Sequence, residues 1–174
     1  MPAARALWLI PEERVRARLA EVIGRLASAH GSPRFEPHVT LVAGITLERE
    51  ELVARARTLA RDTPPVAVTL TRLSGGPAYY RALVLDVACE RLLALHRLAA
   101  ALVGRAEDPA FRPHVSIMYA DLTPASRAVI AAQIGQAWDL PCVLGRLGVV
   151  RVEGPPSAWT REEDLPASAA PTGS

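Results

Sequence analysis

Residues 111–117 read FRPHVSI and residues 35–41 read FEPHVTL. Both stretches follow the pattern Phe-x-Pro-His-Val-[Ser/Thr]-aliphatic, and their histidines, His38 and His114, stand 76 positions apart (114 − 38). A solenoid is not expected, because such arrays need three or more repeats. Two copies of one pattern in a short chain instead predict two similar lobes, related by an approximate two-fold axis, each contributing one copy to a shared cleft.

Successive side chains on a β-strand alternate between its two faces, so a strand through each motif sorts its residues into two sets. One set pairs His38 with Thr40 in the first copy and His114 with Ser116 in the second. The other set is aliphatic and would anchor each strand in a core. Each predicted lobe therefore presents one imidazole beside one hydroxyl to the cleft.

Two imidazoles across a cleft can act as an acid/base pair, because the ordinary histidine pKa of about 6.5 keeps both protonation states accessible near neutral pH. Hydroxyls can donate hydrogen bonds to the non-bridging oxygens of a phosphate. An in-line displacement at phosphorus needs a base that activates water on one side and an acid that protonates the leaving oxygen on the other. The doubled motif therefore predicts phosphoester hydrolysis with no metal and no cofactor.

Other interpretations of the histidines are weaker. A single Pro-His-Val-Thr stretch is more often a structural histidine than a catalyst, and a relic of duplication could retain the Phe, Pro and Val for packing. Such a relic gives no reason to retain both the histidine and the hydroxyl. A metal site at His38 and His114 lacks a carboxylate or cysteine at a suitable spacing. His30 and His96 fall within amphipathic helical patterns and are assigned to surface or packing positions.

The rest of the chain alternates between β-rich runs and helical spacing. Pro11 followed by two glutamates predicts a helix start with proline at the first helical position, and Thr123 before a proline predicts another. In chain order we predict a strand over 5–10, a helix over 11–30, a strand over 38–44, a helix over 46–61, a hairpin of strands 66–73 and 79–87, a helix over 91–103, a strand at the second motif, a helix over 123–138, and β-structure over 142–152 and 157–161.

Length and charge narrow the functional classes. A chain of 174 residues suits one domain with a substantial core. The net charge of +2 is far from the strongly basic surface of a protein that binds long nucleic acid through many phosphates, so a small anionic ligand is expected. All 20 basic residues are arginines, whose planar guanidinium groups match phosphate.

The cysteines and the length of the apolar runs indicate in which cellular compartment the protein is expected. Cys89 and Cys142 have no metal-ligand spacing, so two buried thiols are expected. Apolar runs fall short of the roughly 20 residues of a membrane span, and the initial apolar stretch is too short for a signal peptide. We therefore expect a cytoplasmic monomer without a membrane partner. A single domain should span 1–164, and residues 165–174 (LPASAAPTGS) should form a disordered tail.

The paired His-x-[Ser/Thr] motifs resemble the signature of the two-histidine (2H) phosphoesterase superfamily. The stretches ALWLIPEE, YYRALVLDV after a glycine-rich turn, and RPHVSIMYADL follow in the order and approximate spacing of its cyclic phosphodiesterase branch, found in plants and yeast. The resemblance covers about residues 5–161. It implies a bilobal α+β fold with pseudo-two-fold symmetry, antiparallel sheets lining a central cleft, and helices outside.

The resemblance also implies an activity: hydrolysis of ADP-ribose 1″,2″-cyclic phosphate to ADP-ribose 1″-phosphate, and of nucleoside 2′,3′-cyclic phosphates to 2′-phosphates, without a metal. The partner would be a small cyclic nucleotide substrate, with no long nucleic acid. The signature positions correspond to His38, Thr40, His114 and Ser116, with His114 as the base and His38 as the acid. Plant members carry more cysteines, so redox control by disulfides is not expected here.

Aromatic side chains are expected to hold the base of a nucleotide by stacking, with core packing as the alternative. Tyr79 and Tyr80 stand where the family has an aromatic cluster, Tyr119 follows the second motif, and Trp8 lies on the first strand. Strict alternation points Tyr119 away from the cleft unless the strand bends, bulges or ends there, and it sends only one of Tyr79 and Tyr80 inward. Trp159 is assigned a structural role, although the family also has a tryptophan near this place.

Arginines near these segments are candidates for binding phosphate, and for each the alternative is a solvated surface position. The candidates are Arg34, Arg72, Arg81 and Arg112. Two other functions stay open. An RNA 2′,5′-ligase-like enzyme that acts on RNA ends would need a basic groove and an arginine beside the second motif, which Arg112 matches only faintly. A non-catalytic module that binds nucleotides or RNA ends would need no acid/base pair.

Overall fold

The computed structural model describes residues 3–135 and 137–168. The strands are β1 (Arg5–Pro11), β2 (Val39–Ile45), β3 (Val66–Ser74), β4 (Leu83–Ala88), β5 (His114–Met118), β6 (Ala137–Arg151) and β7 (Thr160–Pro166). The helices are α1 (Glu13–His30), α2 (Arg49–Asp62), α3 (Glu90–Leu102) and α4 (Pro124–Ile134), with 3-10 turns η1 (Tyr79–Arg81) and η2 (Pro156–Ala158). No helix within the described residues is both long and apolar enough to cross a membrane.

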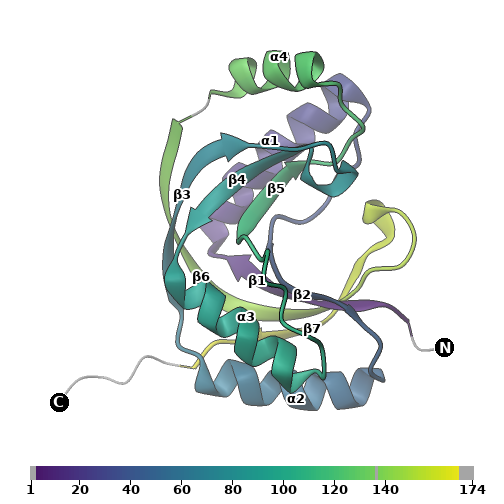
Figure 1. The fold of residues 1–174 in the computed structure, drawn as a ribbon, viewed down its shortest axis with the longest axis vertical. Helices are drawn as coiled ribbons and strands as arrows, with labels where there is room; N and C mark the ends of the chain where they lie inside the picture. Colours follow the sequence, from purple (N-terminus) through teal and green to yellow (C-terminus); the bar gives the residue numbers. More distant parts are fainter. Residues whose placement is uncertain (1–2, 136, 169–174) are drawn as a thin grey trace.

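The sheet is antiparallel throughout and closes on itself. Its order is β1-β2-β5-β4-β3-β6-β7, and β6 also pairs with β1, so the first six strands form a closed, barrel-like arrangement. Strand β6 reaches both partners because it is long: its first half pairs with β3 and its second half with β1. Figure 1 shows α1 and α4 toward one end of the curved sheet and α2 and α3 toward the other, all on its outer side.

The two sequence motifs belong to two units with the same order of strands and helices. The order β1-α1-β2-α2-β3 is followed by β4-α3-β5-α4-β6, with one motif strand, β2 or β5, at the centre of each unit. These two strands meet at a single antiparallel pair, Val39 with Val115, which are the equivalent residues of the two motifs. Two equivalent residues that pair with each other lie on the pseudo-two-fold axis, so the bilobal α+β fold with antiparallel sheets and outer helices is confirmed.

The aliphatic face of each motif is buried as the alternation predicts. Val39 and Val115 are fully buried, and so are Leu41 and Ile117. These side chains join one core with the inward faces of the helices, including Leu19 of α1. Because this packing holds the strands from behind, the histidines and hydroxyls are left on the opposite, inner face of the sheet.

Several predicted boundaries are wrong, each because a tertiary contact overrides the local pattern. Pro11 ends β1 rather than starting a helix, since it pairs with Leu144 of β6. Tyr79 and Tyr80 lie in the turn η1 instead of a strand. The helix predicted through Trp138 ends at Ile134, because that tryptophan is part of β6.

The C-terminal end also differs from the prediction. Strand β7 includes Leu165 and Pro166, two residues beyond the predicted end of the domain, and Leu165 is buried. The backbone N–H of Ser168 donates to the carbonyl oxygens of Ala60 and Thr63. The rest of the predicted tail, residues 169–174, lies outside the described residues.

Candidate active site

The two motif histidines are held by the same local hydrogen bond. Nδ1 of His38 lies 2.7 Å from the carbonyl oxygen of Glu36, and Nδ1 of His114 lies 2.7 Å from that of Arg112. A carbonyl oxygen can only accept, so each Nδ1 carries the proton and each neutral ring presents a bare Nε2. Each motif therefore orients its own imidazole through its own backbone, and the same hydrogen bond is present in both copies.

The antiparallel pairing brings the two motifs side by side. Around the Val39–Val115 pair, the register sets His38 beside Ser116 and Thr40 beside His114 on the inner face. The two rings are close enough that a positive charge on His114 lowers the pKa of His38. All four residues predicted as catalytic are thus gathered on one face of two neighbouring strands.

The environments of the two histidines differ. The His38 ring stacks on Trp8 with centroids 3.5 Å apart, and burial lowers the pKa of His38 to about 4. His114 is only half-buried; burial lowers its pKa too and Arg81 lowers it further, while the hydrogen bond to the Arg112 carbonyl and the carboxylate of Asp86 act in the opposite direction. Asp86 is the partner of His114 across β4 and β5. His114 is therefore the easier of the two imidazoles to protonate.

The two hydroxyls also differ. Ser116 is buried, and its Oγ donates to the carbonyl oxygen of Tyr80 at 3.0 Å, which ties β5 to the turn η1. Thr40 is half-buried and borders a cavity of about 290 Å³ that His114 also lines. In this state Thr40 is the hydroxyl that faces open space, and Ser116 must rotate before it can donate to a ligand.

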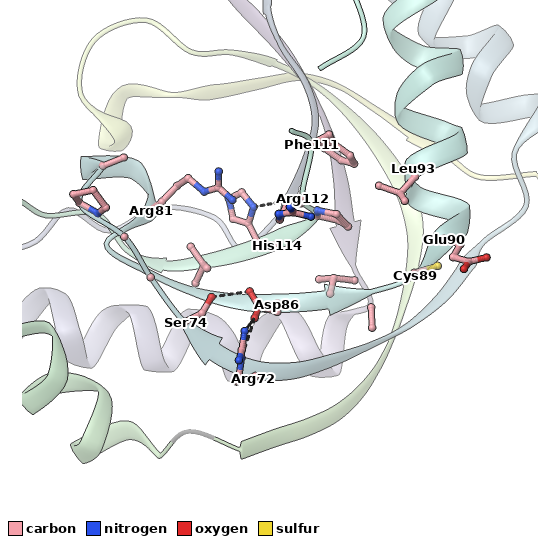
Figure 2. A pocket seen from close by; sticks show the side chains of 18 residues that line it. Arg72, Ser74, Arg81, Asp86, Cys89, Glu90, Leu93, Phe111, Arg112 and His114 are labelled. Carbon is pink, nitrogen blue, oxygen red and sulfur yellow. Dashed lines mark hydrogen bonds and ion pairs between the residues drawn. The ribbon is translucent and has the colours of Figure 1, made fainter. Parts of the chain in front are cut away.

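A second, larger cavity of about 910 Å³ lies on the other side of His114. Figure 2 shows Arg81 extending toward the His114 ring, with Asp86, Ser74 and Arg72 on the adjoining strands. Oδ1 of Asp86 accepts from Ser74 at 2.7 Å, and Oδ2 accepts from Arg72 at 3.1 Å. His114 therefore stands between two cavities, whereas His38, which is 5% exposed beside Trp8, lines neither.

The aromatic candidates gather in one cluster, which reaches His38 through Trp8, and none of them lines either cavity. The Tyr119 ring stacks on Phe35 at 3.8 Å and meets Tyr80 edge-on at 5.3 Å. Strict alternation is therefore misleading for Tyr119: β5 ends at Met118, and its pairing with β4 is bulged, which turns the ring to the inner side. Burial raises the pKa of Tyr119.

Trp159, assigned above to a structural role, stands at the centre of this aromatic cluster. Its ring lies 5.9 Å from each of the Trp8, Tyr80 and Tyr119 rings. Tyr79 joins the cluster edge-on to Tyr80. Figure 1 shows the segment that leads into β7 on the open side of the curved sheet. No local pattern of residues identifies Trp159, because only the pairing of β7 with β6 brings it to β1. The one signal in the sequence was the family resemblance, which has a tryptophan near this place.

The arginine candidates separate into two groups. Arg34 is away from the site, since it donates to Ser28 on α1, and Arg72 is engaged by Asp86. Arg81 and Arg112 line both cavities beside His114. Within residues 3–135 and 137–168, no group of three or more His, Cys, Asp or Glu side chains is arranged to hold a metal ion. Metal independence stays a prediction.

The turn before β4 has no room for a side chain at Gly75. A Cβ there would lie 2.1 Å from the carbonyl oxygen of Ala82, a contact that cannot exist without displacing the backbone. We expect Gly75→Ala to lower the free energy of unfolding by about 1–3 kcal/mol. It should also lower turnover, because the turn carries Arg81 and the carbonyl that holds Ser116. Denaturant unfolding and initial rates would measure both effects.

Gly76→Ala is the matched control for that prediction. It changes the next glycine in the same turn, where an added Cβ meets nothing within 4 Å. Its unfolding curve and its rates should match those of the wild type. Equal behaviour of the two variants would contradict the role given to the close contact at Gly75.

The comparisons with known proteins agree with this geometry. The family model described as cyclic phosphodiesterase-like protein matches residues 1–161. A curated protein named cyclic phosphodiesterase from Arabidopsis thaliana is 26% identical over 120 residues, which are 68% of this chain and 66% of that protein, just under two thirds of its length.

Solved structures share the fold at low identity. TT0787 of Thermus thermophilus superposes with a TM-score of 0.69 and 19% identity, over 95% of this chain and 98% of its own. The apo form of Escherichia coli LigT superposes with a TM-score of 0.65 and 16% identity, over 96% of this chain and 98% of its own. Together with the two His-x-[Ser/Thr] strands paired on one face, the family match means that the chain belongs to the cyclic phosphodiesterase-like family of 2H phosphoesterases.

Proposed function

We propose that this enzyme hydrolyses small cyclic phosphodiesters by acid/base catalysis between His38 and His114. The observation that carries the proposal is the pair of equivalent Nδ1–H to carbonyl hydrogen bonds, which leaves two bare Nε2 atoms on adjacent strands. A structural histidine has no need of a free Nε2, and a binding module has no need of two. An acid and a base for one displacement at phosphorus require both.

Each turnover would deprotonate one imidazole and protonate the other. The base takes a proton from water as the water oxygen forms a bond to phosphorus, and the ring P–O bond breaks as the acid gives its proton to the leaving oxygen. The product is a phosphomonoester with a free hydroxyl. Thr40 and, after rotation, Ser116 would donate to the non-bridging oxygens, where negative charge is greatest.

The environments of the two histidines favour a division of roles opposite to the one that the family resemblance implies. An acid must enter the reaction protonated, and His114 is the easier to protonate because it is only half-buried, whereas His38 is buried. His38, whose pKa is about 4, is neutral at pH 7 and ready to accept a proton. We therefore assign His38 as the base and His114 as the acid.

Substrates of nucleotide size fit the surroundings. The cavity beside His114 measures about 910 Å³, and Tyr80, which is 51% exposed at the edge of the aromatic cluster, offers a ring on which a base can stack. LigT has been solved with 3′-AMP and with NADP+. ADP-ribose 1″,2″-cyclic phosphate and nucleoside 2′,3′-cyclic phosphates are accordingly the proposed substrates, with Trp8, Tyr79, Tyr80 and Tyr119 as the proposed binding residues.

Phosphorus NMR tests the proposal directly. The purified protein, in excess EDTA, is incubated with ADP-ribose 1″,2″-cyclic phosphate and separately with the four nucleoside 2′,3′-cyclic phosphates. We expect the ring resonance to disappear and phosphomonoester resonances of the 1″- and 2′-phosphates to replace it. If no ring opens while nucleotide still binds, the proposal is wrong and a binding module or an enzyme of RNA ends takes its place.

A further inference from the structure

The smaller cavity beside the catalytic residues is surrounded by positive charge. It measures about 290 Å³, and besides Thr40 and His114 its lining includes Arg81, Arg105 and Arg112. These arginines come from three different segments: the turn before β4, the loop after α3, and the second motif. Guanidinium groups repel one another, so their convergence on one small space favours an anion as its occupant.

Arg105 is held over β2 by the local backbone. Its backbone N–H donates to the carbonyl oxygen of Ala100 at 2.8 Å, which fixes the chain just after α3. Its guanidinium lies against Gly44, where an added Cβ would be 3.3 Å from a terminal nitrogen of Arg105. A glycine is required at this position of β2 for a second reason, since its φ is +66°. The two lobes therefore cooperate to place one arginine at the cavity.

The positive charge at the cavity is only partly neutralised by the protein. Within the described residues, none of Arg81, Arg105 and Arg112 forms an ion pair, in contrast to Arg72, which pairs with Asp86 on the far side of His114. The one acidic residue among those described that lines the cavity is Asp108; its carboxylate accepts the backbone N–H of Ala110 at 2.9 Å and offsets part of the positive charge, but it forms no ion pair with the three arginines. Three guanidinium groups therefore remain available for a ligand.

We propose that this cavity binds a second phosphate group of the substrate, with Arg105 as its principal ligand. The inference rests on the proposed function, because it places this subsite next to the ring phosphate at Thr40 and His114. Arg81 and Arg112 border both cavities, whereas Arg105 lines the small one alone. The preferred substrates are therefore cyclic phosphodiesters that carry a further phosphate, either a terminal phosphomonoester or a diphosphate.

The test compares three substrates: adenosine 2′,3′-cyclic phosphate with a free 5′-hydroxyl, the same compound with a 5′-phosphate, and ADP-ribose 1″,2″-cyclic phosphate. For the wild type, kcat/KM should be about tenfold or more higher for at least one of the two substrates that carry a further phosphate than for the substrate with a free 5′-hydroxyl. Most of this advantage should come from a lower KM. Arg105→Ala should abolish this advantage and leave kcat for the first substrate unchanged. Arg105→Lys should retain part of it, because it retains the charge.

Arg25→Ala is the matched control, since it removes one exposed arginine on α1 that lines neither cavity beside His114. The Arg25→Ala variant should retain the whole kcat/KM advantage for substrates that carry a further phosphate. Equal kcat/KM for all three substrates in the wild type, or an advantage that survives in Arg105→Ala, would overturn the subsite while leaving the proposed function intact. Failure of the wild type to open any of the three rings would overturn the proposed function as well, so the two failures are distinguishable.

Discussion

Replacing either His38 or His114 with alanine should lower kcat for a cyclic phosphodiester by about a hundredfold or more, because each variant loses one of the two groups that move a proton in the transition state. Initial rates followed by phosphorus NMR would measure the loss. His30→Ala serves as the control, since His30 is an exposed residue in the last turn of α1. Near-wild-type turnover in either motif variant, with the fold intact, would refute the two-histidine mechanism.

The same two variants can separate acid from base. In an analogue of uridine 2′,3′-cyclic phosphate with sulfur in place of the leaving ring oxygen, the leaving group departs without a proton and no longer needs the acid. We expect this analogue to restore most of the activity of His114→Ala but not that of His38→Ala. The reverse pattern would favour the division of roles that the family resemblance implies.

The second large effect is on stability at low pH. Burial lowers the pKa of His38 to about 4, against about 6.5 in an unfolded chain, so below pH 6.5 the unfolded state takes up the proton first. The stabilisation from a neutral His38 is therefore complete above pH 6.5 and is lost as the pH falls toward 4, by about 3 kcal/mol in total. Denaturant unfolding at pH 7, 5.5 and 4 would measure this loss.

His38→Gln is the informative comparison, because it replaces the imidazole with a side chain that does not titrate. Its free energy of unfolding should start lower at pH 7, since the Trp8 stacking is lost, and should then decline less steeply than that of the wild type. Carboxylates contribute to both curves alike and cancel in the difference. Parallel curves for the two proteins would show that His38 is not buried in its neutral form.

Much of the fold follows from local pattern. The helix predicted over 11–30 corresponds to α1, and Thr123 accepts the backbone N–H of Ser126 as the predicted cap of α4. The motif strands bury Val39 and Val115 and turn their histidines to the other face. These predictions succeeded because helical periodicity, helix capping and the alternation of side chains along a strand all depend on residues close in sequence.

The predictions failed where residues distant in sequence decide the outcome. Asp86 lies opposite His114 only because β4 pairs with β5 in one register. Trp159 reaches Trp8 through the pairings of β6 with β7 and with β1. Arg105 lines the same cavity as Thr40 because a loop of one lobe packs against Gly44 of the other. Strand register and loop path are set by packing across the whole domain, and no window of the sequence encodes them.

The chemical groups of the site can be read directly from the chain: two histidines, each with a hydroxyl two positions later, a proline before it and a carbonyl two positions earlier that holds Nδ1. Each of these relationships spans at most a few residues, so backbone geometry alone enforces it in both copies. The differences between the copies depend instead on the folded domain. Trp8 buries His38, His114 stays half-buried between Arg81 and Asp86, and three arginines line the cavity that Thr40 borders. Those differences arise from contacts between residues far apart in the chain, and they are what assign separate roles to two motifs that read alike.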